Sequence, residues 1–281
     1  MSAQIINGKE LASKIKLELK NKISCLSTKP NLAVIIVGTN PASEVYVKNK
    51  EKACLEVGIS TTTHKLPSNT TEEELINLIT KLNSDNNING ILVQLPLPKH
   101  INTDKILSSI SPYKDVDGFH PLNTGLLLKK SSNAFIPCTP KGIIKLLHLV
   151  KDNLTGLNAV IVGRSQIVGL PVANLLLNEN TTVTITHSKT KNLASICKNA
   201  DILVAAVGIP EFITKDYIKQ GAIIIDVGIN RTQEGLKGDV KFSDAKNLAS
   251  HITPVPGGVG PMTIAMLLEN TYLAYLNQTN S

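Results

Sequence analysis

The feature of this 281-residue chain that most restricts its fold is a repeated alternation of short apolar runs with helical patterns. The runs are rich in Val and Ile, and this alternation predicts βαβ units around a mostly parallel sheet. In the first half we expect helix 8–26, strand 32–37, helix 41–57, strand 59–66, helix 71–84 and strand 90–94. In the second half we expect strand 159–162, helix 168–178, strand 182–186, helix 192–199, strands 202–206 and 222–227, and helix 261–276.

The texture of the sequence changes between these halves. Residues 95–142 are rich in Pro, Gly and Asp and show little periodicity, which predicts loops at a functional edge or a domain junction. Because single cores rarely grow beyond about 250–300 residues, two lobes are expected. We predict an α/β lobe over residues 1–139, completed by a returning C-terminal helix in 261–281, and a second α/β lobe over 140–260.

Composition excludes several classes of protein. The net charge of +7 comes from scattered lysines, and there are five Tyr, four Phe and no Trp. A nucleic-acid surface needs clustered basic residues with stacking rings, whereas a mild positive excess suits a polyanionic small molecule such as a dinucleotide. No apolar stretch of ~18 residues is present, and the N-terminus lacks the apolar core of a signal peptide. We therefore expect no membrane association and a cytosolic protein.

Cysteine and histidine spacing argues against a metal centre. The four cysteines, Cys25, Cys54, Cys138 and Cys197, are far apart and form no C-x-x-C pair. The six histidines form no pair with ligand spacing. We interpret the cysteines as free thiols and predict no bound metal.

A candidate phosphate-binding turn follows the first strand of the second half. That strand ends at Gly163 and a helix begins within a few residues, which would leave N-terminal amides free to meet a pyrophosphate. The glycine pattern is Gly163-Arg164-Ser165-x-x-x-Gly169 instead of G-x-G-x-x-G. This segment alone is compatible with a Rossmann-like dinucleotide lobe or with a generic βα turn.

The end of the next strand indicates which cofactor is bound. NAD-specific sites usually have Asp or Glu here for the ribose 2′-hydroxyl, but this chain has His187-Ser188-Lys189-Thr190. Hydrogen-bond donors and a cation at this position favour a ribose 2′-phosphate and hence NADP. The guanidinium of Arg164 could bind the same phosphate. The alternative is that the four residues only cap the following helix.

Two later strand ends place glycines where the carboxyl edge of a parallel sheet meets its ligand. They lie in residues 205–210 and 226–230. Ile229, directly after Gly228, is a candidate for contact with the rings of the cofactor.

A second group of polar residues lies in the first half. Tyr46 and Lys50 are spaced i, i+4 and share one face of a helix, which in isolation predicts only a solvated helix edge. Gln94 comes at the carboxyl end of a strand. Asp117 lies in the loop KDVDGFHP, where two aspartates have no obvious structural need.

Nine segments together resemble the bifunctional methylenetetrahydrofolate dehydrogenase/cyclohydrolase family. They are IINGKELA, YVKNK, VQLPLP, DVDGFHPLNTGLL, PCTPKG, VGRSQIVGLPVA, THSKT, DVGIN and PVPGGVGPMTIAMLLENT. The resemblance covers essentially the whole chain. It implies oxidation of 5,10-methylenetetrahydrofolate by NADP+, followed by hydrolysis of the 5,10-methenyl product to 10-formyltetrahydrofolate.

The resemblance also implies residue roles that agree with side-chain chemistry. Lys50 would transfer protons during hydration if burial and neighbours lower its pKa, and Gln94 would hold its amine. Asp117 would accept hydrogen bonds from the pterin, and Tyr46 would stack on the aminobenzoyl ring.

The glycine-rich run near the C-terminus is the last segment with an implied role. Pro256, Gly257 and Gly260 would let the backbone approach the folate closely. The resemblance further implies a homodimer, and we expect the substrate cleft between the lobes. Two other hypotheses remain open at this point: a dehydrogenase without hydrolase activity, and a non-catalytic dinucleotide sensor.

Overall fold

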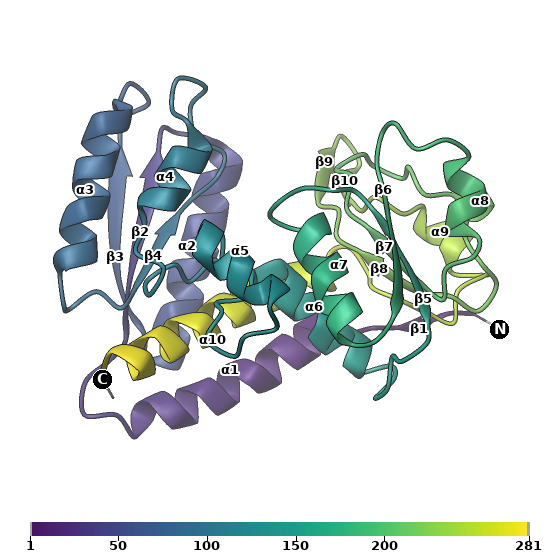
Figure 1. The fold of residues 1–281 in the computed structure, drawn as a ribbon, viewed down its shortest axis with the longest axis horizontal. Coiled ribbons are helices and arrows are strands. Elements are labelled where there is room, and N and C mark those ends of the chain that lie inside the picture. The colour runs from purple at the N-terminus through teal and green to yellow at the C-terminus, as the bar shows by residue number, and fades with distance from the viewer. Residues whose placement is uncertain (1, 280–281) are drawn as a thin grey trace. The chain divides into compact units, whose positions relative to one another are not determined.

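The computed structural model describes residues 2–279, which form two α/β units (Figure 1). The three-stranded unit comprises residues 13–138 and 264–279, and the six-stranded unit comprises residues 2–12 and 139–263. The predicted α/β class with two lobes is confirmed. No helix within the described residues is long and apolar enough to cross a membrane.

The three-stranded unit contains a parallel sheet in the order β3-β2-β4. Its strands are β2 (Asn31–Val37), β3 (Ser60–Leu66) and β4 (Gly90–Val93). Its helices are α2 (Pro41–Val57), α3 (Glu72–Ser84), α4 (Thr103–Ser109) and α5 (Pro121–Leu128), together with most of α1 (Gly8–Ser24) and α10 (Val259–Thr279).

The central strand β2 is buried on both faces. Its odd positions Ala33, Ile35 and Val37 pack in one core cluster with apolar residues of α3 and α4. Its even positions point to the other face and are at most 3% exposed. A near-continuous apolar run is expected for a parallel strand covered on both sides.

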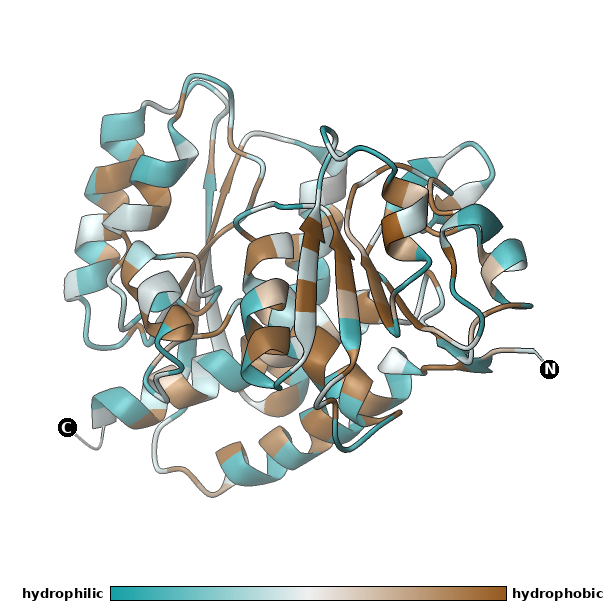
Figure 2. Ribbon diagram, turned by 45° about the vertical axis from the view of Figure 1, so that its right-hand side comes forward, coloured by the Kyte–Doolittle hydropathy of each residue, from teal (hydrophilic) through white to brown (hydrophobic). Residues whose placement is uncertain are grey.

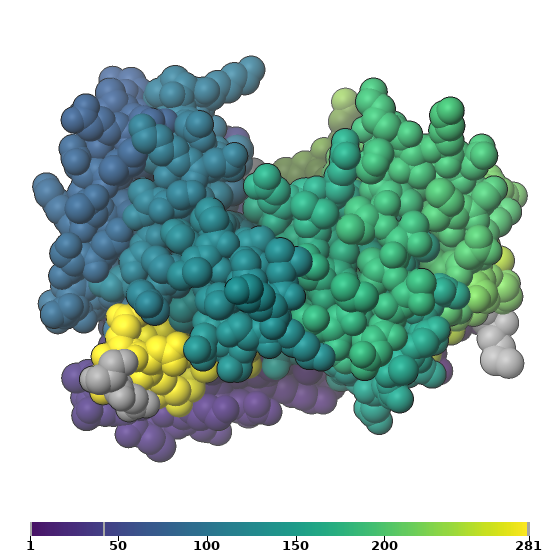
Figure 3. All heavy atoms as spheres, in the orientation of Figure 1, coloured from purple at the N-terminus to yellow at the C-terminus, as the bar shows by residue number. Residues whose placement is uncertain are grey.

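The C-terminal helix belongs to the three-stranded unit, as expected from the sequence. In this unit α10 runs beside α1, seen as yellow against purple in Figure 3. The Tyr275 hydroxyl of α10 also hydrogen-bonds the Thr28 hydroxyl just after α1, at 2.7 Å. Residues far apart in the chain therefore complete one core.

The six-stranded unit contains an all-parallel sheet in the order β1-β11-β8-β7-β5-β6. Its strands are β1 (Gln4–Ile5), β5 (Asn158–Val162), β6 (Thr182–Thr186), β7 (Ile202–Ala205), β8 (Ile223–Asp226) and β11 (His251–Ile252). The other elements are α6 (Cys138–His148), α7 (Gly169–Asn178), α8 (Leu193–Cys197), α9 (Phe242–Ala245), the 3₁₀ turn η1 (Lys215–Tyr217) and the antiparallel pair β9 (Asn230–Thr232) and β10 (Gly235–Lys237). The inner strands are largely apolar along their length (Figure 2).

The strand order of this sheet creates a switch point beside β5. Because β6 and β7 flank β5 on opposite sides, the chain reverses its direction of travel across the sheet there. Gly163, with φ +125°, ends β5 so close to β7 that an added Cβ would overlap the Ala206 carbonyl. In open α/β sheets, ligands bind at the carboxyl edge next to such a point.

Several elements differ from those expected. Residues 95–142, expected as loops, contain α4, α5 and the first part of α6. The helices α4 and α5 are short, with seven and eight residues. Asn102 caps the start of α4, where its Oδ1 accepts from Lys105 N. His120, followed by Pro121, caps the start of α5. The two-residue strand β1 pairs with β11 in the six-stranded sheet, although we had expected all of residues 1–139 in the other lobe. The elements expected from the alternation of apolar runs and helical patterns also did not include α6, the β9–β10 hairpin, α9 or β11.

Candidate active site

A lysine and a glutamine meet at the carboxyl edge of the three-stranded sheet. Lys50 lies on α2, which follows the central strand, and it is only 9% exposed. Gln94 directly follows β4, and its backbone N–H donates to the Ile35 carbonyl of β2. The Lys50 Nζ donates to Gln94 Oε1 at 3.1 Å, while Gln94 Nε2 donates to the Leu95 carbonyl at 2.7 Å. The amide is therefore fixed in one orientation, with its oxygen toward the amine.

Asp117 is partly buried near this lysine. Burial raises the pKa of its carboxyl, the positive charge of Lys50 opposes the rise, and the charge of Asp115 adds to it. The Cys138 thiol lies 3.7 Å from Asp117 Oδ1. The structure therefore brings Lys50, Gln94 and Asp117 into one part of the three-stranded unit. Tyr46 lies one turn before Lys50 on α2 and is half-buried.

Asp115 builds the loop that presents Asp117, a role missed in the sequence. Its carboxyl is 1% exposed and accepts backbone N–H groups of three successive residues, Gly118, Phe119 and His120, at 2.8–3.1 Å. It also accepts Asn123 Nδ2 at 2.8 Å. Burial raises the pKa of Asp115, and these donors oppose the rise. The sequence signal for this role was an Asp three residues before Gly118, which is a common turn pattern.

Asn270 on α10 supports the same loop and was also missed. Its side chain is fully buried, and Nδ2 donates to the Val116 and Ile136 carbonyls at 2.9 and 3.0 Å. It thereby joins the backbone next to Asp117 to the segment before α6. An Asn in a largely apolar helix gives no sequence signal of the residues that it will bond.

Ser165 occupies the turn after β5 in a way that corrects one expectation. Its hydroxyl accepts from the Val168 and Gly169 N–H groups at 3.2 and 3.3 Å, and its carbonyl accepts from Leu170 N at 3.0 Å. The first amides of α7, expected to be free for a pyrophosphate, are satisfied within the turn. The hydroxyl acts as a local cap because the residue before α7, Val168, has no capping side chain.

Gly169 explains the departure of this turn from the usual glycine spacing. A Cβ at Gly169 would overlap the Gly163 carbonyl, so the helix starts in direct contact with the strand end. The neighbouring side chain of Arg164 is exposed. Both glycines of the predicted pattern are thus required for close backbone approach.

The segment His187–Thr190 is a closed turn at the end of β6. His187 N donates to Thr190 Oγ1 at 2.9 Å, and Lys189 N donates to His187 Nδ1 at 3.1 Å. The helix that follows begins at Leu193 after Asn192, so the alternative that these residues cap it is wrong. His187 and Thr190 close the turn, which leaves the side chains of Ser188 and Lys189 exposed. This turn adjoins Gly163, whose N–H donates to Thr186 O.

The remaining predicted residues, Ile229 and the glycine-rich run 256–260, lie in another part of the six-stranded unit. Ile229 is 42% exposed, and a Cβ on Gly260 would lie 3.3 Å from its Cδ1. Gly257 has φ +108°, and its carbonyl accepts from Lys9 N, while Pro256 before it is exposed. The glycine run is therefore packed on the start of α1 at one end and on Ile229 at the other.

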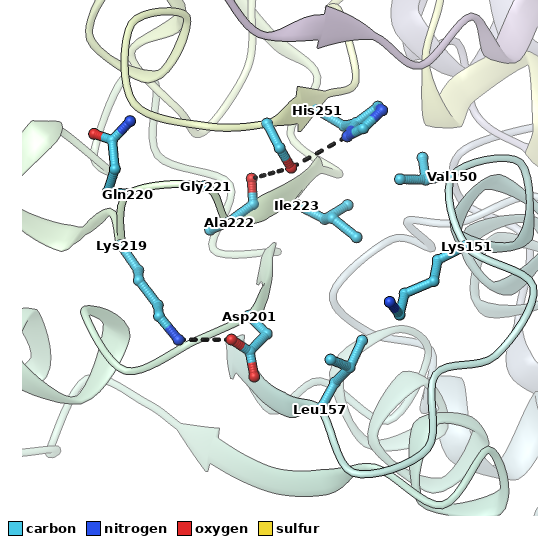
Figure 4. Close-up of a pocket in the computed structure, with 11 residues that line it drawn as sticks. Val150, Lys151, Leu157, Asp201, Lys219, Gln220, Gly221, Ala222, Ile223 and His251 are labelled. Carbon is cyan, nitrogen blue, oxygen red and sulfur yellow. Dashed lines mark hydrogen bonds and ion pairs between the residues drawn. The ribbon is translucent and has the colours of Figure 1, made fainter.

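A cavity of about 320 Å³ lies at the opposite edge of the six-stranded sheet (Figure 4). Val150, Leu157 and Ile223 supply apolar walls, and Lys219 and Asp201 form an ion pair at 2.6 Å. It opens near the amino ends of β7, β8 and β11, and none of the residues predicted from sequence line it. Among residues 2–279, no three His, Cys, Asp or Glu side chains form a group able to hold a metal ion.

The fold and the two polar edges define a two-unit α/β enzyme of the dinucleotide-binding class. Models of the tetrahydrofolate dehydrogenase/cyclohydrolase family match residues 6–117, as the catalytic domain, and residues 137–279, as the NAD(P)-binding domain. The chain belongs to this family, which confirms the resemblance found in the sequence.

Individual relatives are similar over nearly the full length. The bifunctional protein FolD of Acetivibrio thermocellus is 56% identical over 98% of this chain and 97% of its own. The crystal structure of FolD from Campylobacter jejuni has a TM-score of 0.96 at 50% identity, covering 98% and 99% of the two chains. The Trypanosoma brucei enzyme, solved with NADP cofactor and inhibitor, has a TM-score of 0.96 at 38% identity and covers 100% of both chains.

Proposed function

We propose that this protein oxidises 5,10-methylenetetrahydrofolate with NADP+ and hydrolyses the resulting 5,10-methenyltetrahydrofolate to 10-formyltetrahydrofolate. The observation that carries the proposal is the buried Lys50 amine, held by Gln94 near Asp117, in a chain of this family. A dinucleotide sensor gives no reason for these three groups to share one edge.

The first step is a hydride transfer. Bound NADP+ supplies the hydride acceptor. The methylene carbon of the substrate loses a hydride and becomes the methenyl cation, and no proton leaves the carbon. This chain therefore has to align two ligands, and its side chains need not act as acid or base in this step.

The second step needs proton transfers, and we assign them to Lys50. Water adds to the methenyl carbon and loses a proton, which leaves a hydroxyl group on that carbon. The bond from this carbon to N5 then breaks as N5 gains a proton and the hydroxyl group loses its proton, so that a formyl group remains on N10 and one proton is released overall. An amine within reach can accept the first proton and return one to N5. Gln94 directs the amine, because its oxygen accepts from Lys50 Nζ and its nitrogen is held by Leu95 O.

Folate binding is assigned to residues with matching hydrogen-bonding or packing chemistry. Asp117 would accept from the amino and ring N–H donors of the pterin, which favour its ionised form. Tyr46 would stack on the aminobenzoyl ring. Pro256, Gly257 and Gly260 would allow the backbone to approach the folate, because glycine carries no Cβ.

NADP recognition is assigned to the carboxyl edge of the six-stranded sheet. Gly163 and Ser165 shape the turn after β5. Arg164 and Ser188 are exposed on neighbouring turns and would engage the 2′-phosphate. Ile229 would contact the nicotinamide end. The fit rests on these exposed donors and on the absence of an acidic residue at the end of β6.

A two-product assay tests this function. The protein is incubated with 5,10-methylenetetrahydrofolate and NADP+, and the methenyl and formyl products are followed separately. We expect both to form. Formation of methenyl product alone, with added methenyltetrahydrofolate also left unhydrolysed, would show a dehydrogenase without hydrolase activity. Formation of neither would refute the proposal.

We also propose a cytoplasmic homodimer joined through the six-stranded unit. On the edge strand β6, Ile185 is 40% exposed, and on the adjoining helix α7, Leu177 is 60% exposed. An edge strand with exposed apolar residues beside it is a suitable surface for a second copy. Light scattering on purified protein should give twice the chain mass, and a monomer mass would contradict this proposal.

A further inference from the structure

Two buried carboxyl groups lie behind the carboxyl edge of the six-stranded sheet, and the function described above does not use them. Asp226 is the last residue of β8 and is 4% exposed. Asp239 follows the β9–β10 hairpin and is fully buried. Burying a carboxyl group costs free energy unless it is hydrogen-bonded. The hydrogen-bond partners of each carboxyl therefore indicate what it does in the fold.

Asp239 joins two loops that leave neighbouring strands. Its Oδ2 accepts the Val207 and Gly208 N–H groups, at 2.6 and 2.9 Å, from the loop after β7. Its Oδ1 accepts Asn230 Nδ2 at 2.9 Å, from the segment after β8. One side chain therefore fixes the relative position of both loops.

Asp226 in turn fixes Asp239. Its Oδ1 accepts from Gly228 N and Asp239 N at 3.0 and 2.8 Å, and its Oδ2 accepts from Val240 N at 2.9 Å. A Cβ on Gly228 would overlap Asp239 Oδ1, and a Cβ on Gly238 would overlap Asp226 Oδ2. The two carboxyls are thus packed directly on backbone, with no room for the loops to shift.

Each of the two loops carries an exposed isoleucine. Ile209 follows Gly208 and is 50% exposed, and Ile229 follows Gly228 and is 42% exposed. An exposed apolar side chain on a rigidly held loop at a ligand-binding edge is suited to contact a flat ring of the ligand.

We propose that Asp239 is a positioning residue that holds Ile209 and Ile229 at the separation required by the nicotinamide end of NADP. This inference rests on the proposed function, which places NADP at this edge. Asp239 itself does not touch the cofactor. It lowers the entropic cost of ordering the two loops when NADP+ binds, because both loops are already held in place in the free protein.

The Asp239–Asn230 pair allows a test by reversal. In D239N the amide oxygen can still face Val207 and Gly208, but its NH₂ then faces the NH₂ of Asn230, donor against donor. In N230D two carboxylates face each other. The double variant D239N/N230D restores a donor opposite an acceptor, with the direction of the bond reversed.

The readouts are NADP+ binding by calorimetry, dehydrogenase kcat and KM, and methenyltetrahydrofolate hydrolysis without NADP+. We expect D239N to bind NADP+ at least about tenfold more weakly. Hydrolysis should fall less than NADP+ affinity, because Lys50, Gln94 and Asp117 belong to the other unit and Asp239 bonds none of the residues assigned to folate binding. The double variant should recover most of the NADP+ affinity.

Unchanged NADP+ affinity in D239N, equal losses of binding and hydrolysis, or failure of the double variant to recover would each overturn the inference. If D239N does not fold, Ile209→Ala serves instead, since the side chain is half exposed and its removal leaves the core intact. NADP+ binding unchanged in Ile209→Ala would also overturn it. A parent protein that does not bind NADP+ would refute the proposed function instead.

Discussion

A single amide determines the direction in which the Lys50 amine points. Gln94 is held by its own backbone hydrogen bond to β2 and by its side-chain bond to Leu95 O, so it has little freedom to follow the lysine. The amine is therefore presented from a fixed acceptor, as a proton-transfer group should be.

Replacing Lys50 separates the two chemical steps. Lys50→Met keeps much of the apolar length but removes the amine, so hydrolysis of methenyltetrahydrofolate should fall by roughly 100-fold to 10,000-fold. Dehydrogenation should fall less, because hydride transfer needs no proton from this residue. Both rates are measured on the same preparation, with Lys48→Met, an exposed lysine of the same helix, as control. Parent-like hydrolysis by the variant would place the proton transfer on another group.

Cofactor choice is also decided by single side chains. We expect catalytic efficiency with NADP+ to exceed that with NAD+ by at least roughly tenfold, since pairing with the 2′-phosphate is worth more than about 1.4 kcal/mol. Arg164→Ala should reduce this preference, mainly by lowering efficiency with NADP+. Lys198→Ala, which removes the same charge from an exposed position after α8, should keep it. Equal use of both cofactors by the parent protein would refute the assignment.

At the scale of elements, sequence patterns predicted most of the long elements and missed several short ones, and they also missed the eleven-residue helix α6. The alternation of apolar runs and helices located β2, β5, β6 and their connecting helices within one or two residues, because burial imposes a long periodic signal. The helices α4 and α5 depend on one capping residue each, and β1 and β11 are two-residue strands defined only by pairing with distant residues. A local pattern contains no information about such partners.

The residues of the candidate site also fall into those that the sequence could identify and those that it could not. Lys50, Gln94 and Asp117 could be named because each stands in a motif. Asp115 stands in the same motif as Asp117, and its local turn pattern with Gly118 was overlooked. Asn270 could not be named, because it holds backbone groups that approach it only in the folded chain. Ser165 was named for the cofactor, and the structure shows that it also caps α7.

The start of α7 offers a test at this scale. In Gly169→Ala the new methyl overlaps the Gly163 carbonyl, so the helix must move away from the strand end. We expect a loss of unfolding free energy of about 1–3 kcal/mol, as for overpacking, together with weaker NADP+ binding. Gly125→Ala is the matched control, because this helical glycine has no atom within 4 Å of an added Cβ. It should be neutral or slightly stabilising. Urea unfolding measures both, and equal stability of the two variants would contradict the close contact.

At the scale of the whole molecule, the Asp226 carboxyl links stability to pH. Burial raises its pKa from 3.8 to about 7, against the effect of its N–H donors. The folded chain therefore binds this proton more tightly than the unfolded chain. The resulting stabilisation is complete below pH 3.8 and is lost as pH rises to about 7.

The corresponding experiment compares melting temperatures of the parent and Asp226→Asn between pH 5 and 8. The parent should lose stability relative to the variant as pH rises, by up to a few kcal/mol across the window. The comparison uses the change with pH, since the variant also loses an acceptor for backbone N–H groups. A constant difference between the two curves would show that Asp226 does not titrate in this range.

The pairing of β1 with β11 restricts the order in which the protein is completed on the ribosome. Gln4 lies opposite His251, so the first strand to be translated has to wait for a partner 247 residues later. At about 5–20 residues per second this delay is roughly 12–50 s. The segment that completes the three-stranded unit, residues 264–279, is translated later still. During this interval the six-stranded sheet is incomplete and the three-stranded unit has its sheet but lacks α10, so the nascent chain exposes apolar surface that is buried in the folded protein.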